Sequence, residues 1–228
     1  MPPLEIFVHI PKTGGTSLRE AAARHYGERR MLYDYGAHSA QTSALVQDWV
    51  YRRRNLAGFA DAVKDGPYRF LAGHFHRVKY DRVLPDARYL TWMRDPRQRL
   101  WSMYRHFVRH KGYTDTFEAF YRDERFLNQQ SRIMNGSTEG FEFVGVLEHY
   151  RESLRGLERA VGLRLEERKA NRAPADDVPG LPTEEDWANI EALHGDDAAL
   201  YAVAASRFER RGWRQRLRRL APPGPWNG

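Results

Sequence analysis

The chain of 228 residues contains no cysteine. This absence excludes disulfide bonds, thiolate metal sites and a cysteine nucleophile. The chain also lacks any apolar run near the ~18 residues that a membrane-spanning helix needs. A signal peptide has an uncharged apolar core near its N-terminus, and the charged Glu5 lies within that region here. We therefore expect a cytoplasmic protein without a membrane span.

Acidic residues are scarce at the C-terminal end. Residues 207–228 contain seven Arg and one Glu, a net charge of +6, whereas residues 1–206 carry only +1. We predict a single domain over residues 1–206 and a basic tail over residues 207–228. A basic helix over residues 207–219 would suit weak contact with a polyanion or a membrane surface, and a solvated helix end is the alternative.

Strand-like and helix-like patterns alternate along the chain. Apolar, β-rich segments cover residues 4–10, 68–72, 88–93 and 141–146, and helical patterns follow most of them. Further helices begin near Thr183 and Asp196, after a polar surface loop over residues 168–182. This alternation predicts an α/β fold with a mainly parallel central sheet. Ligands of such sheets bind beyond the carboxyl ends of the strands.

A glycine-rich loop follows the first predicted strand. Its sequence is Pro11-Lys12-Thr13-Gly14-Gly15-Thr16-Ser17. Glycines let the backbone approach a ligand, backbone N–H groups at a helix N-terminus favour anions, and the lysine and hydroxyl groups add donors. The loop is not the P-loop of NTPases, because its lysine precedes the glycine pair. The pattern predicts a phosphate site, and an ordinary strand-to-helix turn is the alternative.

A second candidate anion site follows the third predicted strand. Arg94 ends that strand, Asp95 and Pro96 are suited to start a helix, and Ser102 lies off the apolar stripe of this helix, on a face with Arg99. An arginine fork and a hydroxyl suit a terminal phosphate. Two anion sites at two strand ends predict a bisphosphorylated ligand.

The histidines separate into one candidate base and several structural candidates. Gly73-His74-Phe75-His76 follows the second predicted strand, and histidine is the usual base near neutral pH. His9 fits a hydrogen-bonded structural residue better than a catalyst. His106 and His110 lack the glutamate of a zinc-binding HExxH motif and fit a solvated helix face. We expect no metal site.

HIPKTGGTSL (9–18) and RDPRQRLWSMY (94–104) together resemble motifs of the sulfotransferases that use 3′-phosphoadenosine 5′-phosphosulfate (PAPS). The resemblance is strongest to the heparan sulfate 2-O-sulfotransferase-like branch and its bacterial relatives, and it implies a P-loop-like three-layer fold. It also implies 5′-phosphosulfate binding by Lys12, Thr13, Gly14, Gly15, Thr16 and Ser17, 3′-phosphate binding by Arg94 and Ser102, and His74 as the base. His76 lies two residues after His74, whereas that branch often has its second histidine two residues before. Asn171 and Arg172 fall where the family often has another loop that contacts PAPS.

The resemblance implies transfer of a sulfuryl group from PAPS to a hydroxyl acceptor, a carbohydrate or another small molecule, with 3′-phosphoadenosine 5′-phosphate (PAP) as the product. Lys12 would neutralise charge on the bridging oxygen as His74 removes the acceptor proton. Two alternatives remain open. One is a nucleotide-dependent phosphoryl-transfer enzyme, because an anion loop alone does not distinguish ATP from PAPS. The other is a non-catalytic polyanion-binding protein that uses the arginine-rich tail.

Overall fold

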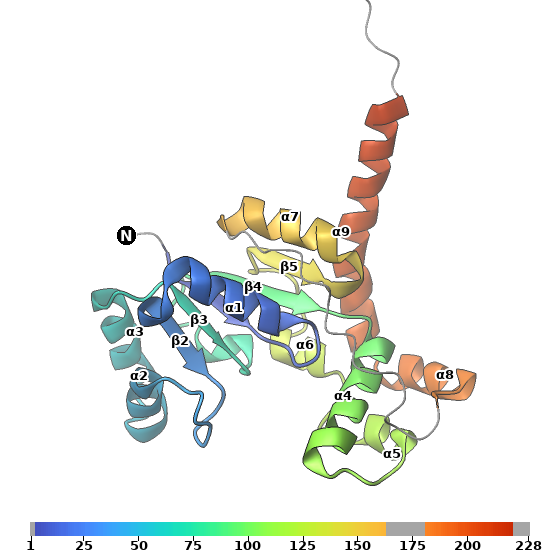
Figure 1. The fold of residues 1–228 in the computed structure, drawn as a ribbon, viewed down its shortest axis with the longest axis horizontal. Helices are drawn as coiled ribbons and strands as arrows, with labels where there is room; N and C mark the ends of the chain where they lie inside the picture. Colours follow the sequence, from blue (N-terminus) through green and yellow to red (C-terminus); the bar gives the residue numbers. More distant parts are fainter. Residues whose placement is uncertain (1–2, 163–180, 221–228) are drawn as a thin grey trace, which may run out of the picture.

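The computed structural model describes residues 3–162 and 181–220, with backbone alone for residues 209–220. A five-stranded parallel sheet forms its centre (Figure 1). Its strands are β1 (Glu5–Val8), β2 (Met31–Asp34), β3 (Phe70–Gly73), β4 (Arg88–Met93) and β5 (Phe143–Val146), in the order β2-β3-β1-β4-β5. The predicted α/β fold with a mainly parallel sheet is confirmed.

Four of the five strands were predicted, and β2 was not. Its sequence, Met31-Leu32-Tyr33-Asp34, is short and follows a 3-10 turn, so it carries little periodicity. β2 is an edge strand beside β3, with Asp34 opposite Gly73. In β1 every residue is buried, as expected for a parallel sheet covered on both faces.

Helices cover both faces of the sheet and give three layers. The helices are α1 (Gly15–Tyr26), α2 (Ala44–Val46), α3 (Leu56–Asp65), α4 (Pro96–Lys111), α5 (Phe117–Arg122), α6 (Gln129–Met134), α7 (Tyr150–Val161), α8 (Glu184–Leu193) and α9 (Gly195–Leu220). α1 and α7 pack on the face that carries Phe7 and Phe70. α3, α6 and α9 pack on the face that carries Ile6 and Val8. Short helical segments lie at Glu28–Arg30 (η1), Gln47–Arg52 (η2), Arg77–Lys79 (η3) and Leu147–His149 (η4).

The caps of two helices agree with the sequence. Asp95 begins α4 and accepts hydrogen bonds from the N–H groups of Arg97 (2.9 Å) and Gln98 (3.2 Å), with Pro96 in the first turn. Thr183 begins α8 in a capping box with Asp186. α4, α5 and α8 enclose an aromatic cluster beside the sheet.

α9 runs through the predicted start of the basic tail at residue 207. Arg207 Nη2 donates a hydrogen bond to Thr138 Oγ1 (2.9 Å), and the buried Phe208 ring stacks on His149 at 5.5 Å. The helix then projects beyond the sheet (Figure 1). Arg207 and Phe208 therefore belong to the packed body. None of the described helices has the length and apolarity needed to span a membrane.

Gly73 offers a test of how β2 and β3 determine the carboxyl edge of the sheet. A Cβ atom here would overlap the backbone carbonyl of Asp34, which cannot move without breaking the pairing of the two strands. We expect Gly73→Ala to lower the free energy of unfolding by about 3 kcal/mol. Urea unfolding measures the change. Gly195→Ala is the matched control, because a Cβ there meets no atom of the described residues within 4 Å. An equally small effect in both variants would contradict the prediction.

Candidate active site

The motif residues meet at the carboxyl edge of three neighbouring strands. β1 lies between β3 and β4, and Val8 is paired with Gly73 on one side and Thr91 on the other. The glycine-rich loop follows β1, His74 follows β3 and Arg94 follows β4. The structure thus brings together groups that are far apart in the sequence.

The loop after β1 leaves the start of α1 open to an anion. Gly14 precedes the helix with φ 86°, and Lys12 has φ 68°, a left-handed conformation that is rare for residues other than glycine. No side chain of the described residues caps α1, and its first turn contains no acidic residue. The helix dipole and the first N–H groups therefore favour a negatively charged ligand.

The hydroxyl groups of the loop have different surroundings. Thr13 is fully buried and its Oγ1 donates a hydrogen bond to the carbonyl of Ile10 (2.8 Å). This bond stabilises the turn and occupies the hydroxyl proton that was predicted to face a ligand. Thr16 is exposed and Ser17 half-buried, both in the first turn of α1.

Arg94 contacts the loop and is held through its own backbone. Its Nη1 donates a hydrogen bond to the carbonyl of Lys12 (3.4 Å), and its Nε lies 4.0 Å from Glu148 Oε1. The buried side chain of Gln130 accepts a hydrogen bond from Arg94 N (3.0 Å) and donates one to Arg94 O (2.9 Å). Arg94 Nε itself is buried without a hydrogen bond among the described residues. An anion beside it would supply the missing acceptor.

Positive charge accumulates around Lys12. Burial lowers the pKa of Lys12, and the nearby charges of Arg94 and Arg109 lower it further. Burial also lowers the pKa of Arg94, partly offset by Glu148 and Asp95. Arg109 was not predicted as a site residue, although it lies seven residues, or two helical turns, beyond Ser102 on α4. The like charges repel one another, and an anion bound among them would relieve that repulsion.

Ser102 and Arg99, predicted to share a face of α4, have different surroundings. Ser102 is half-buried, and no hydrogen bond of its hydroxyl to a described residue is observed. Arg99 is fully buried; its Nη1 donates to Gln129 Oε1 (2.7 Å), and its Nη2 lies 3.8 Å from Asp197 Oδ2. Arg99 therefore connects α4 to α6 and α9.

His74 is oriented as a base would be. Its Nδ1 lies 2.8 Å from the carbonyl oxygen of His9, which can only accept a hydrogen bond, so Nδ1 carries the proton and Nε2 is free to accept another. Its backbone N–H donates to the carbonyl of Asp34 (2.9 Å). The ring is partly exposed, but the protein packed around it lowers its pKa, and Arg19 lowers it further against the opposing effect of the His9 carbonyl. The imidazole is thus neutral at pH 7.

His9 packs between His74 and the glycine-rich loop. Its ring stacks on His74 at 4.5 Å and on Phe7 at 5.2 Å, and a Cβ on Gly15 would overlap it. Burial, followed by the charge of His74, lowers the pKa of His9 to about 3. Its Nδ1 has no hydrogen-bond partner among the described residues, so the predicted hydrogen-bonded role is wrong for this atom.

Of the remaining candidates, His106 lies near Lys12: burial lowers the pKa of His106, and the charge of Lys12 lowers it further. His76 is exposed, and its Nδ1 lies 2.9 Å from the carbonyl of Arg132, at the side of α6. On α4, His106 is half-buried and His110 exposed, with ring centroids 4.9 Å apart. Asn171 and Arg172 lie outside the described residues.

Comparisons with known proteins find similarity only in three dimensions. No protein-family model matches the chain, and no curated protein matches its sequence. The structure is similar to the crystal structure of a sulfotransferase from Alicyclobacillus acidocaldarius, with a TM-score of 0.53 and 16% identity over 90% of this chain and 97% of that one. It is also similar to mouse sulfotransferase SULT7A1 complexed with PAP, with a TM-score of 0.46 and 15% identity over 83% of this chain and 62% of that one. At this identity the likeness to the Alicyclobacillus acidocaldarius structure shows a shared fold alone, as the sequence resemblance predicted.

The buried imidazole of His9 predicts how stability depends on pH. Its folded-state pKa of about 3 lies below the ordinary 6.5, so below pH 6.5 the unfolded chain binds a proton that the folded chain does not. Stability therefore falls as the pH falls through this range, and His9 contributes about 2 kcal/mol of the loss between pH 7.5 and 5. We expect His9→Phe to remove this contribution in urea unfolding at the two pH values. His38→Phe, at an exposed histidine, is the control. If the free energy of unfolding depended on pH equally in His9→Phe and in the native chain, this contribution of His9 would be refuted.

Proposed function

We propose that the protein is a sulfotransferase that transfers the sulfuryl group of PAPS to the hydroxyl of an acceptor. The observation that carries the proposal is the convergence of an uncapped helix start, the cations Lys12 and Arg94 and a neutral imidazole at one sheet edge. The motifs at residues 9–18 and 94–104 resemble most those of the heparan sulfate 2-O-sulfotransferase-like branch, and this resemblance favours a carbohydrate hydroxyl as acceptor. The fold shared with a bacterial sulfotransferase supports the proposal.

The residues present fit a donor with two separate anionic groups. The loop from Lys12 to Ser17 would hold the 5′-phosphosulfate, with no acidic side chain in the first turn of α1 to oppose it. Arg94 and Ser102 would hold the 3′-phosphate, which would provide an acceptor for the buried Arg94 Nε. PAPS would supply an activated sulfuryl group whose leaving group is PAP.

In the proposed reaction, His74 Nε2 accepts the proton of the acceptor hydroxyl while the hydroxyl oxygen forms a bond to sulfur. The bond from sulfur to the bridging oxygen breaks in line with the attack, and its electron pair leaves with PAP. Lys12 neutralises the charge that develops on that oxygen, and the loop N–H groups assist. The remaining acceleration comes from positioning the two substrates.

Replacing the base separates catalysis from donor binding. We expect His74→Ala to lower turnover by about 10²-fold or more, because proton removal from the acceptor loses its base. Affinity for PAP should stay close to that of the native chain. Turnover is measured as label transferred from PAPS to an acceptor identified by screening, and PAP affinity by calorimetry. His25→Ala, an exposed histidine near the end of α1, is the control. An equal loss of PAP affinity in His74→Ala would remove His74 from the role of base.

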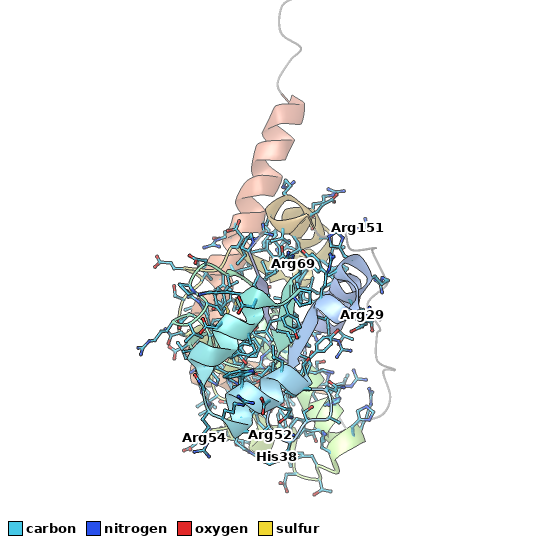
Figure 2. All side chains as sticks on the ribbon, turned by 90° about the vertical axis from the view of Figure 1, so that its left-hand side faces the viewer. Arg29, His38, Arg52, Arg54, Arg69 and Arg151 are labelled. Carbon is cyan, nitrogen blue, oxygen red and sulfur yellow. The ribbon has the colours of Figure 1, made fainter. Side chains whose placement is uncertain are left out.

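Replacing Arg94 should instead weaken binding of the donor nucleotide. We expect Arg94→Ala to weaken PAP binding by about 10- to 100-fold, the contribution of a hydrogen bond to a charged group. The increase in melting temperature on adding PAP should shrink accordingly. Exposed Arg52, labelled in Figure 2, lies in η2 and gives Arg52→Ala as a control for charge alone. An unchanged PAP shift in Arg94→Ala would exclude it from the donor site.

The same measurement separates sulfuryl transfer from phosphoryl transfer. If the anion loop serves a nucleoside triphosphate, ATP with Mg²⁺ will raise the melting temperature more than PAP does. The proposal requires the reverse order, because Arg94 would bind the 3′-phosphate that ATP lacks.

A further inference from the structure

Arg94 lies beside a carboxylate with which it forms no hydrogen bond. Its Nε is buried without a hydrogen-bond partner among the described residues, although Glu148 Oε1 is only 4.0 Å away. A carboxylate beside a guanidinium ordinarily closes to about 2.8 Å, because charge-assisted hydrogen bonds are short and strong. The Glu148 side chain is 32% exposed, so packing alone does not prevent this movement. Other contacts must therefore hold Glu148 away from Arg94.

Both carboxylate oxygens of Glu148 accept hydrogen bonds from other groups. Oε1 accepts one from the backbone N–H of Asp95 (3.1 Å), the residue that begins α4. Oε2 accepts one from the hydroxyl of Tyr201 (3.1 Å), on α9. Burial, followed by the charge of Glu148, raises the pKa of Tyr201, so this hydroxyl keeps its proton at neutral pH. These two bonds keep the carboxylate outside hydrogen-bond distance of Arg94.

η4, which contains this glutamate, connects α9 with the anion loop. Leu147 lies against the loop, because a Cβ atom on Gly14 would be 2.9 Å from Leu147 Cδ1. At the other end of η4, the His149 ring stacks on Phe208 of α9. α9 also packs beside β5, the strand that precedes η4 (Figure 1). Tyr201 therefore reaches this edge of the sheet from a helix that supplies none of the predicted donor-binding residues.

Glu148 at this distance supports Arg94 without occupying it. Its charge, with that of Asp95, partly offsets the lowering of the Arg94 pKa by burial, and so favours the charged guanidinium. A carboxylate hydrogen-bonded to Arg94 would instead compete with a phosphate for the same nitrogen atoms. The position of Glu148 thus determines whether Arg94 is available to an anionic ligand.

Resting on the proposed sulfotransferase activity, we propose that Tyr201 is a positioning residue of the donor site. Its hydroxyl holds Glu148 away from Arg94 and so leaves the guanidinium available to the 3′-phosphate of PAPS. Tyr201 acts through Glu148 and not by contact with the nucleotide. The C-terminal helix thereby contributes to donor affinity through one hydrogen bond.

The test compares PAP affinity, measured by calorimetry, in Tyr201→Phe, Glu148→Gln and the double variant. We expect Tyr201→Phe to weaken PAP binding by about 5-fold, because Glu148 then closes on Arg94 and PAP must displace a partly exposed ion pair. Glu148→Gln should bind PAP at least as tightly as the native chain, because an uncharged amide neither pairs with Arg94 nor repels the phosphate. In the Glu148→Gln background, Tyr201→Phe should have no further effect.

Tyr33→Phe is the matched control for loss of a tyrosine hydroxyl. The Tyr33 hydroxyl also donates to a glutamate, Glu28 Oε2, at 3.1 Å. It lies on β2, and β3 and β1 separate β2 from β4, the strand that leads to Arg94. PAP affinity should therefore not change in this variant. The melting temperature of each variant without PAP shows whether it is folded.

Three results would overturn the role of Tyr201 while leaving the proposed function in place. One is an unchanged PAP affinity in folded Tyr201→Phe. Another is an equal loss of affinity on Tyr201→Phe in the Glu148→Gln background, since Tyr201 would then act through the packing of α9. The third is weaker PAP binding in Glu148→Gln. Failure of the native chain to bind PAP would overturn the proposed function, and the role of Tyr201 with it.

Discussion

The hydrogen bond from the His74 imidazole to the carbonyl of His9 is the contact on which the site depends. It joins the ends of β3 and β1, two neighbouring strands whose register brings those ends together. It also fixes which nitrogen carries the proton, and so leaves Nε2 as the only basic atom of the ring. The His9 ring that stacks on His74 is neutral, so it packs against the imidazole without adding charge. The position and the protonation state of the His74 imidazole thus have one common cause.

A buried polar cluster supports the same histidine from the opposite side. The backbone carbonyl of Asp34 accepts the His74 N–H, while the carboxylate of Asp34 accepts hydrogen bonds from Tyr51 (2.5 Å), Lys79 (2.5 Å) and Tyr80 (2.7 Å). Because the Asp34 carboxylate is fully buried, each of these partners helps to offset its desolvation. The end of β2 is therefore fixed by side chains from η2, from η3 and from Tyr80, the residue after η3, which lie far from it in the sequence.

The sequence predicted those features that depend on residues close together in the chain. Strand composition, the Asp95-Pro96 helix start and the two anion motifs depend on neighbouring residues, and the fold they predicted is present. Contacts between distant segments left no local signal. Neither the two hydrogen bonds between the Gln130 side chain and the Arg94 backbone nor the stacking of His9 on His74 follows from the spacing of those residues. β2 was not predicted because four residues carry too little periodicity. Arg109 was not predicted because its position on a helix does not show that it lies near Lys12, which comes from another segment of the chain.

The C-terminal helix α9 is connected to the backbone of Arg94 through two steps of hydrogen bonding. Asp197, near the start of α9, accepts hydrogen bonds from the N–H groups of Gln130 (3.2 Å) and Ser131 (2.7 Å) and so caps α6. α6 in turn presents the Gln130 side chain to the Arg94 backbone. The net charge of the C-terminal segment gives no indication of these contacts, because Asp197 lies in the nearly neutral first half of α9, before the arginine-rich residues. α9 is thus part of the scaffold of this edge of the sheet up to Phe208.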